Sequence, residues 1–120
     1  DFDLVLLGLG EDGHTASLFP GHDLGTAADA ADVLAVFDAP KPPPERISLS
    51  ARRLSRARVV LFLVTGAGKR EAVRRWRRGE PIPASLIGAR QCVIVLADEE
   101  ACFEFGRTFA RQVSEYHKGF

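Results

Sequence analysis

The sequence predicts an α/β fold, and two observations indicate this class. Short, continuous apolar runs at 3–8, 59–64 and 93–97 are typical of strands that are buried on both faces. Helix-like segments alternate with these runs, as expected for strands that pair in parallel. Together they predict a Rossmann-like parallel sheet with helices on both faces. The 120 residues suit a small domain, and we expect them to form part of a larger one.

The first half of the chain predicts three strands and one helix. The run DLVLLG at 3–8 is expected to be a fully buried strand, and VLAVF at 33–37 is a second strand candidate. The prolines of APKPPPER at 39–46 exclude both a helix and a central strand. The stretch RISLS at 46–50 predicts a third strand. Its last serine is suited to cap a brief helix, ARRLSRA, at 51–57.

The second half predicts two further strands and two helices. The run VVLFLV at 59–64 is the strongest strand signal in the chain. A helix is expected over 69–79, because its apolar residues form one stripe and a glycine ends it. The segment EPIPASLIG at 80–88 predicts a loop or a single turn. A last buried strand at 93–97 leads into a long helix expected over 98–118.

Charge is balanced overall but divided along the chain. Lys and Arg number 16, as do Asp and Glu, so the composition does not indicate nucleic acid as a partner. Residues 1–45 nevertheless hold nine acidic side chains, and residues 46–79 hold eleven basic ones. This division is compatible with an anion site on the basic half. It is equally compatible with a solvated, arginine-rich helix face.

The spacing of cysteines and histidines and the hydropathy of the chain argue against a disulfide-rich, a metal-binding and a membrane-spanning protein. Cys92 and Cys102 form neither a disulfide framework nor a zinc-binding pattern, and we expect a cytoplasmic protein. His22 and His117 have no partners at metal-ligand spacing, so no metal site is predicted. No apolar run approaches the ~20 residues of a membrane span, and no membrane partner is expected.

The stretch GLGEDG at 8–13 has the G-x-G-x-x-G spacing of dinucleotide-binding loops. That function needs a long helix directly after the glycines, and Pro20 leaves room for little more than one turn. The glycines instead allow a sharp turn at the end of a strand, where open parallel sheets bind ligands. His14 would then enter the ligand crevice, with Asp12 able to fix its tautomer. The alternative is that both are ordinary turn residues.

The stretch GLGEDGHTASLFPG at 8–21 closely resembles the signature of the 6-phosphogluconolactonases. Three later segments are also similar to that family, in the same order: PKPPPERISLS, VVLFLVTGAGKREA and GEPIPASLI. The resemblance covers about residues 1–97. It implies an α/β fold shared with the glucosamine-6-phosphate deaminases. It also implies hydrolysis of 6-phosphoglucono-1,5-lactone in the pentose phosphate pathway, without a metal or an organic cofactor.

One position separates the two related enzyme classes. The deaminases resemble G-x-D-G-H-I-A-F-N-E-P here, with a glutamate five residues after the histidine, where this chain has Phe19. A deaminase needs additional acid–base groups to open a sugar ring and move a proton between carbons. The sequence therefore favours the lactonase. A deaminase/isomerase-like enzyme and a non-catalytic sugar-phosphate-binding module remain as alternatives.

The resemblance also implies roles for individual residues. His14 corresponds to the general base that activates water, and Asp12 to the residue that orients it. Backbone N–H groups of the turn from Gly10 to Gly13 are expected to help stabilise the oxyanion.

Two basic residues are candidates for the substrate's phosphate. Lys69 follows TGAG at a helix start, where N–H groups and the helix dipole attract anions, and the family places a phosphate-binding lysine there. A solvated lysine is the alternative. Arg46 is expected to be either a second anion contact or a strand-edge charge.

The resemblance leaves two parts of a lactonase unmatched. The family also carries an N-terminal half with a Ser-Gly-Gly loop, which this chain lacks, so residues 1–120 are expected to be the C-terminal portion of such a domain. The residues after Ala97 match poorly. Phe105 and Phe109 lie on the apolar face of the helix expected there, which suggests self-association through that helix.

Overall fold

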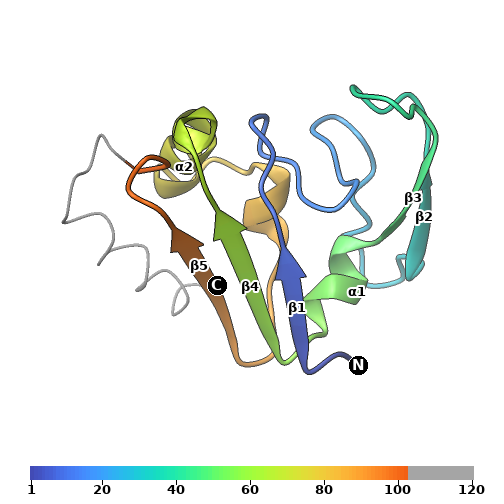
Figure 1. Ribbon diagram of the computed structural model, residues 1–120. Coiled ribbons are helices and arrows are strands. Elements are labelled where there is room, and N and C mark those ends of the chain that lie inside the picture. Colours follow the sequence, from blue (N-terminus) through green and yellow to red (C-terminus); the bar gives the residue numbers. More distant parts are fainter. Residues whose placement is uncertain (103–120) are drawn as a thin grey trace.

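The structure is a computed structural model that describes residues 1–102 of the chain. Its centre is a three-stranded parallel sheet in the order β1-β4-β5 (Figure 1). The strands are β1 (Leu4–Leu7), β4 (Val59–Val64) and β5 (Cys92–Ala97). Leu4 pairs with Val59 at one end of the β1–β4 ladder, and Leu7 pairs with Phe62 at the other. The carboxyl ends of the three strands therefore lie along the same edge, as predicted.

Two of the five expected strands lie outside this sheet. β2 (Val33–Val36) and β3 (Arg46–Leu49) form a separate antiparallel pair, with Val36 opposite Arg46. The expectation of a single parallel sheet is wrong for these strands. A parallel pair needs a crossover of about a dozen residues or more, usually a helix. The proline-rich segment between β2 and β3 is shorter and cannot form one, so the chain reverses direction.

The helices begin and end close to the expected residues. α1 (Ala51–Ser55) is capped by Ser50, whose Oγ accepts a hydrogen bond from the Arg53 N–H at 3.1 Å. A 3₁₀ turn, η1 (Ala67–Lys69), leads into α2 (Arg70–Arg77). The segment after α2 contains one further 3₁₀ turn, η2 (Pro83–Leu86). The helix expected over 98–118 and the self-association assigned to it lie almost entirely outside the described residues; within them, 99–102 form turns.

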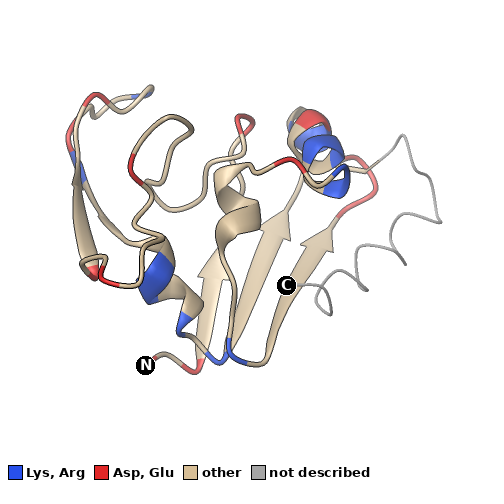
Figure 2. Cartoon of the chain, turned by 180° about the vertical axis from the view of Figure 1, so that it is seen from behind, with Lys and Arg blue, Asp and Glu red and all other residues tan. Residues whose placement is uncertain are grey.

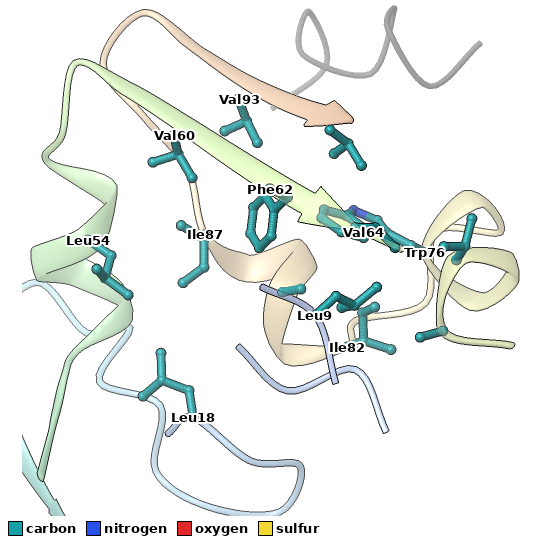
Figure 3. Packing of buried hydrophobic residues seen from close by; sticks show 14 of the residues in the cluster. Leu9, Leu18, Leu54, Val60, Phe62, Val64, Trp76, Ile82, Ile87 and Val93 are labelled. Atoms are coloured by element: carbon teal, nitrogen blue, oxygen red, sulfur yellow. The ribbon is translucent and has the colours of Figure 1, made fainter. Parts of the chain in front are cut away.

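The core lies between one face of the sheet and the helices (Figure 3). Phe62 and Trp76 meet edge to face there, with ring centroids 4.9 Å apart. Trp76, on α2, therefore belongs to the core. The other large residues of the cluster come from the strands, the segment after β1, α1 and the segment around η2, and include Leu9, Leu18, Leu54, Val60, Val64, Ile82, Ile87 and Val93.

The opposite face of the sheet carries exposed leucines. Leu4 and Leu6 are 53% and 59% exposed, and Leu63 and Leu96 are also exposed. The expectation that the strand at 3–8 is fully buried is therefore wrong for Leu4 and Leu6. The segment around η2 crosses the other face, behind the strands in Figure 1 and in front of them in Figure 2.

The basic segments of the chain are divided between two places. α1 lies near the amino ends of the strands, and α2 lies beyond their carboxyl ends (Figures 1 and 2). On α1 and just after it, Arg53 and Arg56 form ion pairs with Asp1 and Asp32. On α2 and at its end, Arg74 pairs with Glu71, and Arg75 and Arg78 pair with Glu80. These pairs favour the solvated helix face over a single large anion site. Among residues 1–102, no helix is long and apolar enough to cross a membrane.

Candidate active site

A tight turn follows β1 at the carboxyl edge of the sheet. The Gly10 N–H donates to the His14 carbonyl at 2.8 Å, and the Gly13 N–H donates to the Gly10 carbonyl at 3.0 Å. The hydroxyl of buried Thr15 donates to the Gly8 carbonyl at 2.8 Å, which ties the turn to the end of the strand. No long helix starts here, so the loop does not have the structure of a dinucleotide-binding site.

His14 and Asp12 form a close pair within this turn. Nδ1 of the imidazole lies 2.6 Å from Oδ1 of Asp12, and the His14 backbone N–H donates to the same oxygen at 3.0 Å. Burial acts to raise the pKa of Asp12, but the hydrogen bonds from the His14 main chain and ring, with the charge of the ring, together hold that pKa below its ordinary value. The aspartate is therefore an acceptor, and it favours the tautomer that carries its proton on Nδ1.

Two glycines allow this arrangement, because other side chains lie where their Cβ atoms would be. A Cβ on Gly10 would overlap the His14 imidazole and lie 2.9 Å from Oδ1 of Asp12. Gly13 has a φ of +90°, and a Cβ there would lie 2.7 Å from Cβ of Ile82. The N–H groups of both glycines donate within the turn itself. The expected role of the turn from Gly10 to Gly13 at an oxyanion stays a prediction, and these two N–H groups are used within the turn in this conformation.

A pocket of about 360 Å³ opens beside the turn. His14, Glu11, Lys69 and Lys41 line it, together with backbone from the turn. Lys69 reaches it from η1, after the neighbouring strand β4, so the two sequence motifs converge where adjacent parallel strands end. Lys41 comes from the proline-rich loop between β2 and β3. This lysine was not predicted as a site residue, because only the fold of the hairpin brings it here.

The sequence profile of the glucosamine-6-phosphate isomerases and 6-phosphogluconolactonases matches residues 1–96. The chain belongs to this family. Over 89 residues it is 44% identical to the 6-phosphogluconolactonase of Homo sapiens, a match that covers 72% of this chain and 34% of that protein. The chain thus spans about a third of the length of this relative.

Solved structures of this family have the same architecture. The 6-phosphogluconolactonase from Trypanosoma brucei superposes with a TM-score of 0.73 at 37% identity, over 88% of this chain and 43% of that one. A monomeric glucosamine-6-phosphate deaminase superposes with a TM-score of 0.66 at 25% identity, over 86% of this chain and 48% of that one. Both enzyme classes of the family therefore share the described fold.

Phe19, at the position where the resemblance leads us to expect a glutamate in the deaminases, lies against His14. Its side chain is 1% exposed, and its ring centroid is 4.6 Å from that of His14. An apolar ring thus occupies a place next to the imidazole that offers no proton donor or acceptor. The substitution was visible in the sequence, but the ring contact was not.

Arg46 is not among the residues that line the pocket of this family member. Its guanidinium donates to backbone carbonyls of the proline-rich loop and lies over the ring of Phe19, 5.2 Å from the centroid. Arg46 is also the first residue of β3, which agrees with the strand-edge interpretation, and the anion contact stays a prediction.

In the described part of the chain, no metal-binding group is arranged at the pocket and no thiol lines it. Among residues 1–102, no group of three or more His, Cys, Asp or Glu side chains is arranged to hold a metal ion. Cys92 and Cys102 are free thiols. Burial, with the nearby charges of Asp98 and Glu99, raises the pKa of the Cys102 thiol, which donates to the Asp98 carbonyl at 3.0 Å. Cys102 therefore has the environment of a structural thiol rather than of a reactive one.

Proposed function

We propose that the protein hydrolyses 6-phosphoglucono-1,5-lactone to 6-phosphogluconate in the pentose phosphate pathway. The observation that carries the proposal is the His14–Asp12 pair in a pocket that two lysines also line. A lactonase needs an activated water, a polarised carbonyl and an anchor for the phosphate. The pair is suited to the first task, and the lysines are suited to the last.

The proposed chemistry follows from the protonation of the pair. With Nδ1–H donated to Asp12, the Nε2 atom of His14 holds a lone pair that accepts a proton from water. The water oxygen attacks the lactone carbonyl carbon and forms a tetrahedral intermediate. The bond from this carbon to the ring oxygen then breaks, and the proton on Nε2 passes to that oxygen. The negative charge of Asp12 stabilises the imidazolium between the two steps.

The two lysines fit an anionic substrate. Lys69 is half-buried at the 3₁₀ turn that precedes α2, and we assign it to the phosphate. Lys41 is exposed on the opposite loop, and we assign it a second contact with the substrate's negative charge. Lysine suits this task because its ammonium acts as a point charge with several donors.

The contact of Phe19 with His14 favours the lactonase over the deaminase of the same family. Ring opening and proton transfer between neighbouring carbons need an extra acid–base group near the histidine, and a phenyl ring supplies none. A sugar-phosphate-binding module without turnover is the second candidate, because the lysine-lined pocket suits binding alone equally well.

Parallel assays on the full-length protein test this proposal. With 6-phosphoglucono-1,5-lactone, acid release is expected well above the spontaneous rate measured without protein. With glucosamine 6-phosphate, no ammonia is expected. Ammonia release would assign the protein to the deaminases. Binding of 6-phosphogluconate without any rate above the spontaneous one would identify a binding module.

The free thiols Cys92 and Cys102 fit the cytoplasmic location that we propose with this function.

A further inference from the structure

The loop that carries Lys41 has an unusual shortage of backbone donors. Four of the residues from 40 to 45 are proline and have no N–H group. One backbone bond closes the loop, from the Ala39 N–H to the Pro44 carbonyl at 2.9 Å. The carbonyls inside the loop therefore need donors from a side chain or from water.

The guanidinium of Arg46 supplies these donors. Its Nη2 donates to the carbonyls of Lys41 at 2.8 Å and Pro42 at 3.2 Å, and its Nε donates to the Pro43 carbonyl at 3.0 Å. Three successive carbonyls thus converge on one planar group. The rigid fork of an arginine suits this geometry, whereas a lysine ammonium presents a single point of contact.

The guanidinium of Arg46 makes a second contact, with the ring of Phe19. Its central carbon lies 5.2 Å from the ring centroid of Phe19, within the range of a cation–π interaction. Phe19 is fully buried and rests on the imidazole of His14. A continuous series of contacts therefore joins the Lys41 backbone, Arg46, Phe19 and His14.

We propose that Arg46 is a positioning residue that sets the place of Lys41 relative to His14, and that it does not bind the substrate itself. The inference rests on the proposed function, in which Lys41 contacts the anionic substrate. It assigns Arg46 to the loop carbonyls instead of to the phosphate, although arginine is a common phosphate ligand.

A double-mutant cycle tests the coupling, with the dissociation constant of 6-phosphogluconate measured by calorimetry. We expect Arg46→Ala and Lys41→Ala each to weaken binding by about tenfold or more, the typical effect of one charge-assisted contact. The double variant is expected to bind no more weakly than Lys41→Ala alone, because Arg46 acts through that lysine. Multiplied effects in the double variant would show that Arg46 touches the ligand, and they would overturn the proposal.

The conservative variant separates geometry from charge. Arg46→Lys keeps a cation over Phe19 but loses the fork, and it is expected to raise KM for the lactone nearly as much as Arg46→Ala, with a smaller change in kcat. Wild-type KM in Arg46→Lys would overturn the inference. The control is Arg53→Lys, since Arg53 also lies over a phenyl ring, 4.4 Å from that of Phe2, at the other end of the sheet. This control is expected to keep wild-type KM and kcat.

A measurement on the wild-type protein tests the proposal even if the Arg46 variants fail to fold. The Nε–H signal of Arg46 in NMR is expected to exchange slowly with water and to stay unchanged as 6-phosphogluconate is added. A signal protected only with ligand present would overturn the proposal. If the protein binds 6-phosphogluconate but does not hydrolyse the lactone, only the proposed function is contradicted. The double-mutant cycle still tests the role of Arg46, because it is measured from dissociation constants.

Discussion

The carboxylate of Asp12 contacts His14 through one oxygen that accepts two hydrogen bonds, from Nδ1 at 2.6 Å and from the backbone N–H at 3.0 Å. The backbone bond fixes the carboxylate, and the carboxylate fixes the imidazole. The ring is 21% exposed, so it is reachable from the pocket without being free in solvent. This geometry predicts effects on activity and on stability when Asp12 or Gly10 is changed.

Asp12→Asn is expected to lower kcat for the lactone by about 10²–10⁴-fold. The amide oxygen keeps an acceptor, but the charge that stabilises the imidazolium is lost, and the amide can select the wrong tautomer. The matched control is Asp23→Asn, because Asp23 Oδ1 accepts from the backbone N–H two residues later, at 2.9 Å, in a turn away from the pocket. Steady-state kinetics of both variants measure the effect. Equal kcat values for the two variants would contradict the role of Asp12.

The lowered pKa of Asp12 predicts a contribution to stability that depends on pH. A carboxyl whose pKa is lower in the folded state stabilises the protein fully above its ordinary pKa of 3.8. This contribution is lost as pH falls from that value through the lower folded pKa. Urea unfolding at a series of acidic pH values is expected to show that the free energy of unfolding falls more steeply with decreasing pH for the wild type than for Asp12→Asn. Parallel curves for the two proteins would show that the pair does not stabilise the fold.

Gly10→Ala is expected to remove most lactonase activity, because the new methyl group overlaps the imidazole of His14 and must displace it. Overpacking of this kind typically costs about 1–3 kcal/mol of stability, so the protein should still fold. Gly88→Ala is the control, since its Cβ meets only ordinary contacts, at 3.9 Å from Ser55. Activity and thermal melting of both variants check this. Normal activity in Gly10→Ala would mean that the observed ring position is not needed.

Lys69→Ala is expected to weaken binding of 6-phosphogluconate by about 10–100-fold, as loss of a charge-assisted contact does. Binding of gluconate, which lacks the phosphate, should not change. Arg58→Ala removes an exposed positive charge at the far end of β4 and should leave both affinities unchanged. Calorimetry with the two ligands measures the difference. Equal losses for both ligands in Lys69→Ala would rule out a specific contact with the phosphate.

Local patterns in the sequence predicted the elements that depend on near neighbours. The apolar run of β4 and the stripe on α2 gave correct strand and helix positions, because burial periodicity is a local property. The glycines and the Asp-Gly-His step likewise placed His14 at the end of β1. The contact between Asp12 and His14 spans two residues, so the spacing allowed it, although it left two ordinary turn residues as an alternative.

Contacts between distant segments were not predictable in this way. Lys41 reaches the pocket only because β2 and β3 pair as a hairpin, and nothing near it in the sequence specifies that. The sequence suggested a role for Arg46 from its charge, whereas its guanidinium donates to carbonyls of a loop that has few N–H groups. Apolar residues on both sides of β1 predicted full burial, but a pattern of this kind does not say what covers Leu6.

The most direct test of the central claim is lactone hydrolysis by His14→Ala in the full-length protein, measured above the spontaneous rate. His22→Ala is the control, because His22 does not line the pocket. If His14 is the general base, the catalysed rate of His14→Ala is lower by about 10²–10⁴-fold, while its thermal melt stays near that of the wild type. The control His22→Ala stays active. Nearly full activity in a normally folded His14→Ala protein would contradict the account.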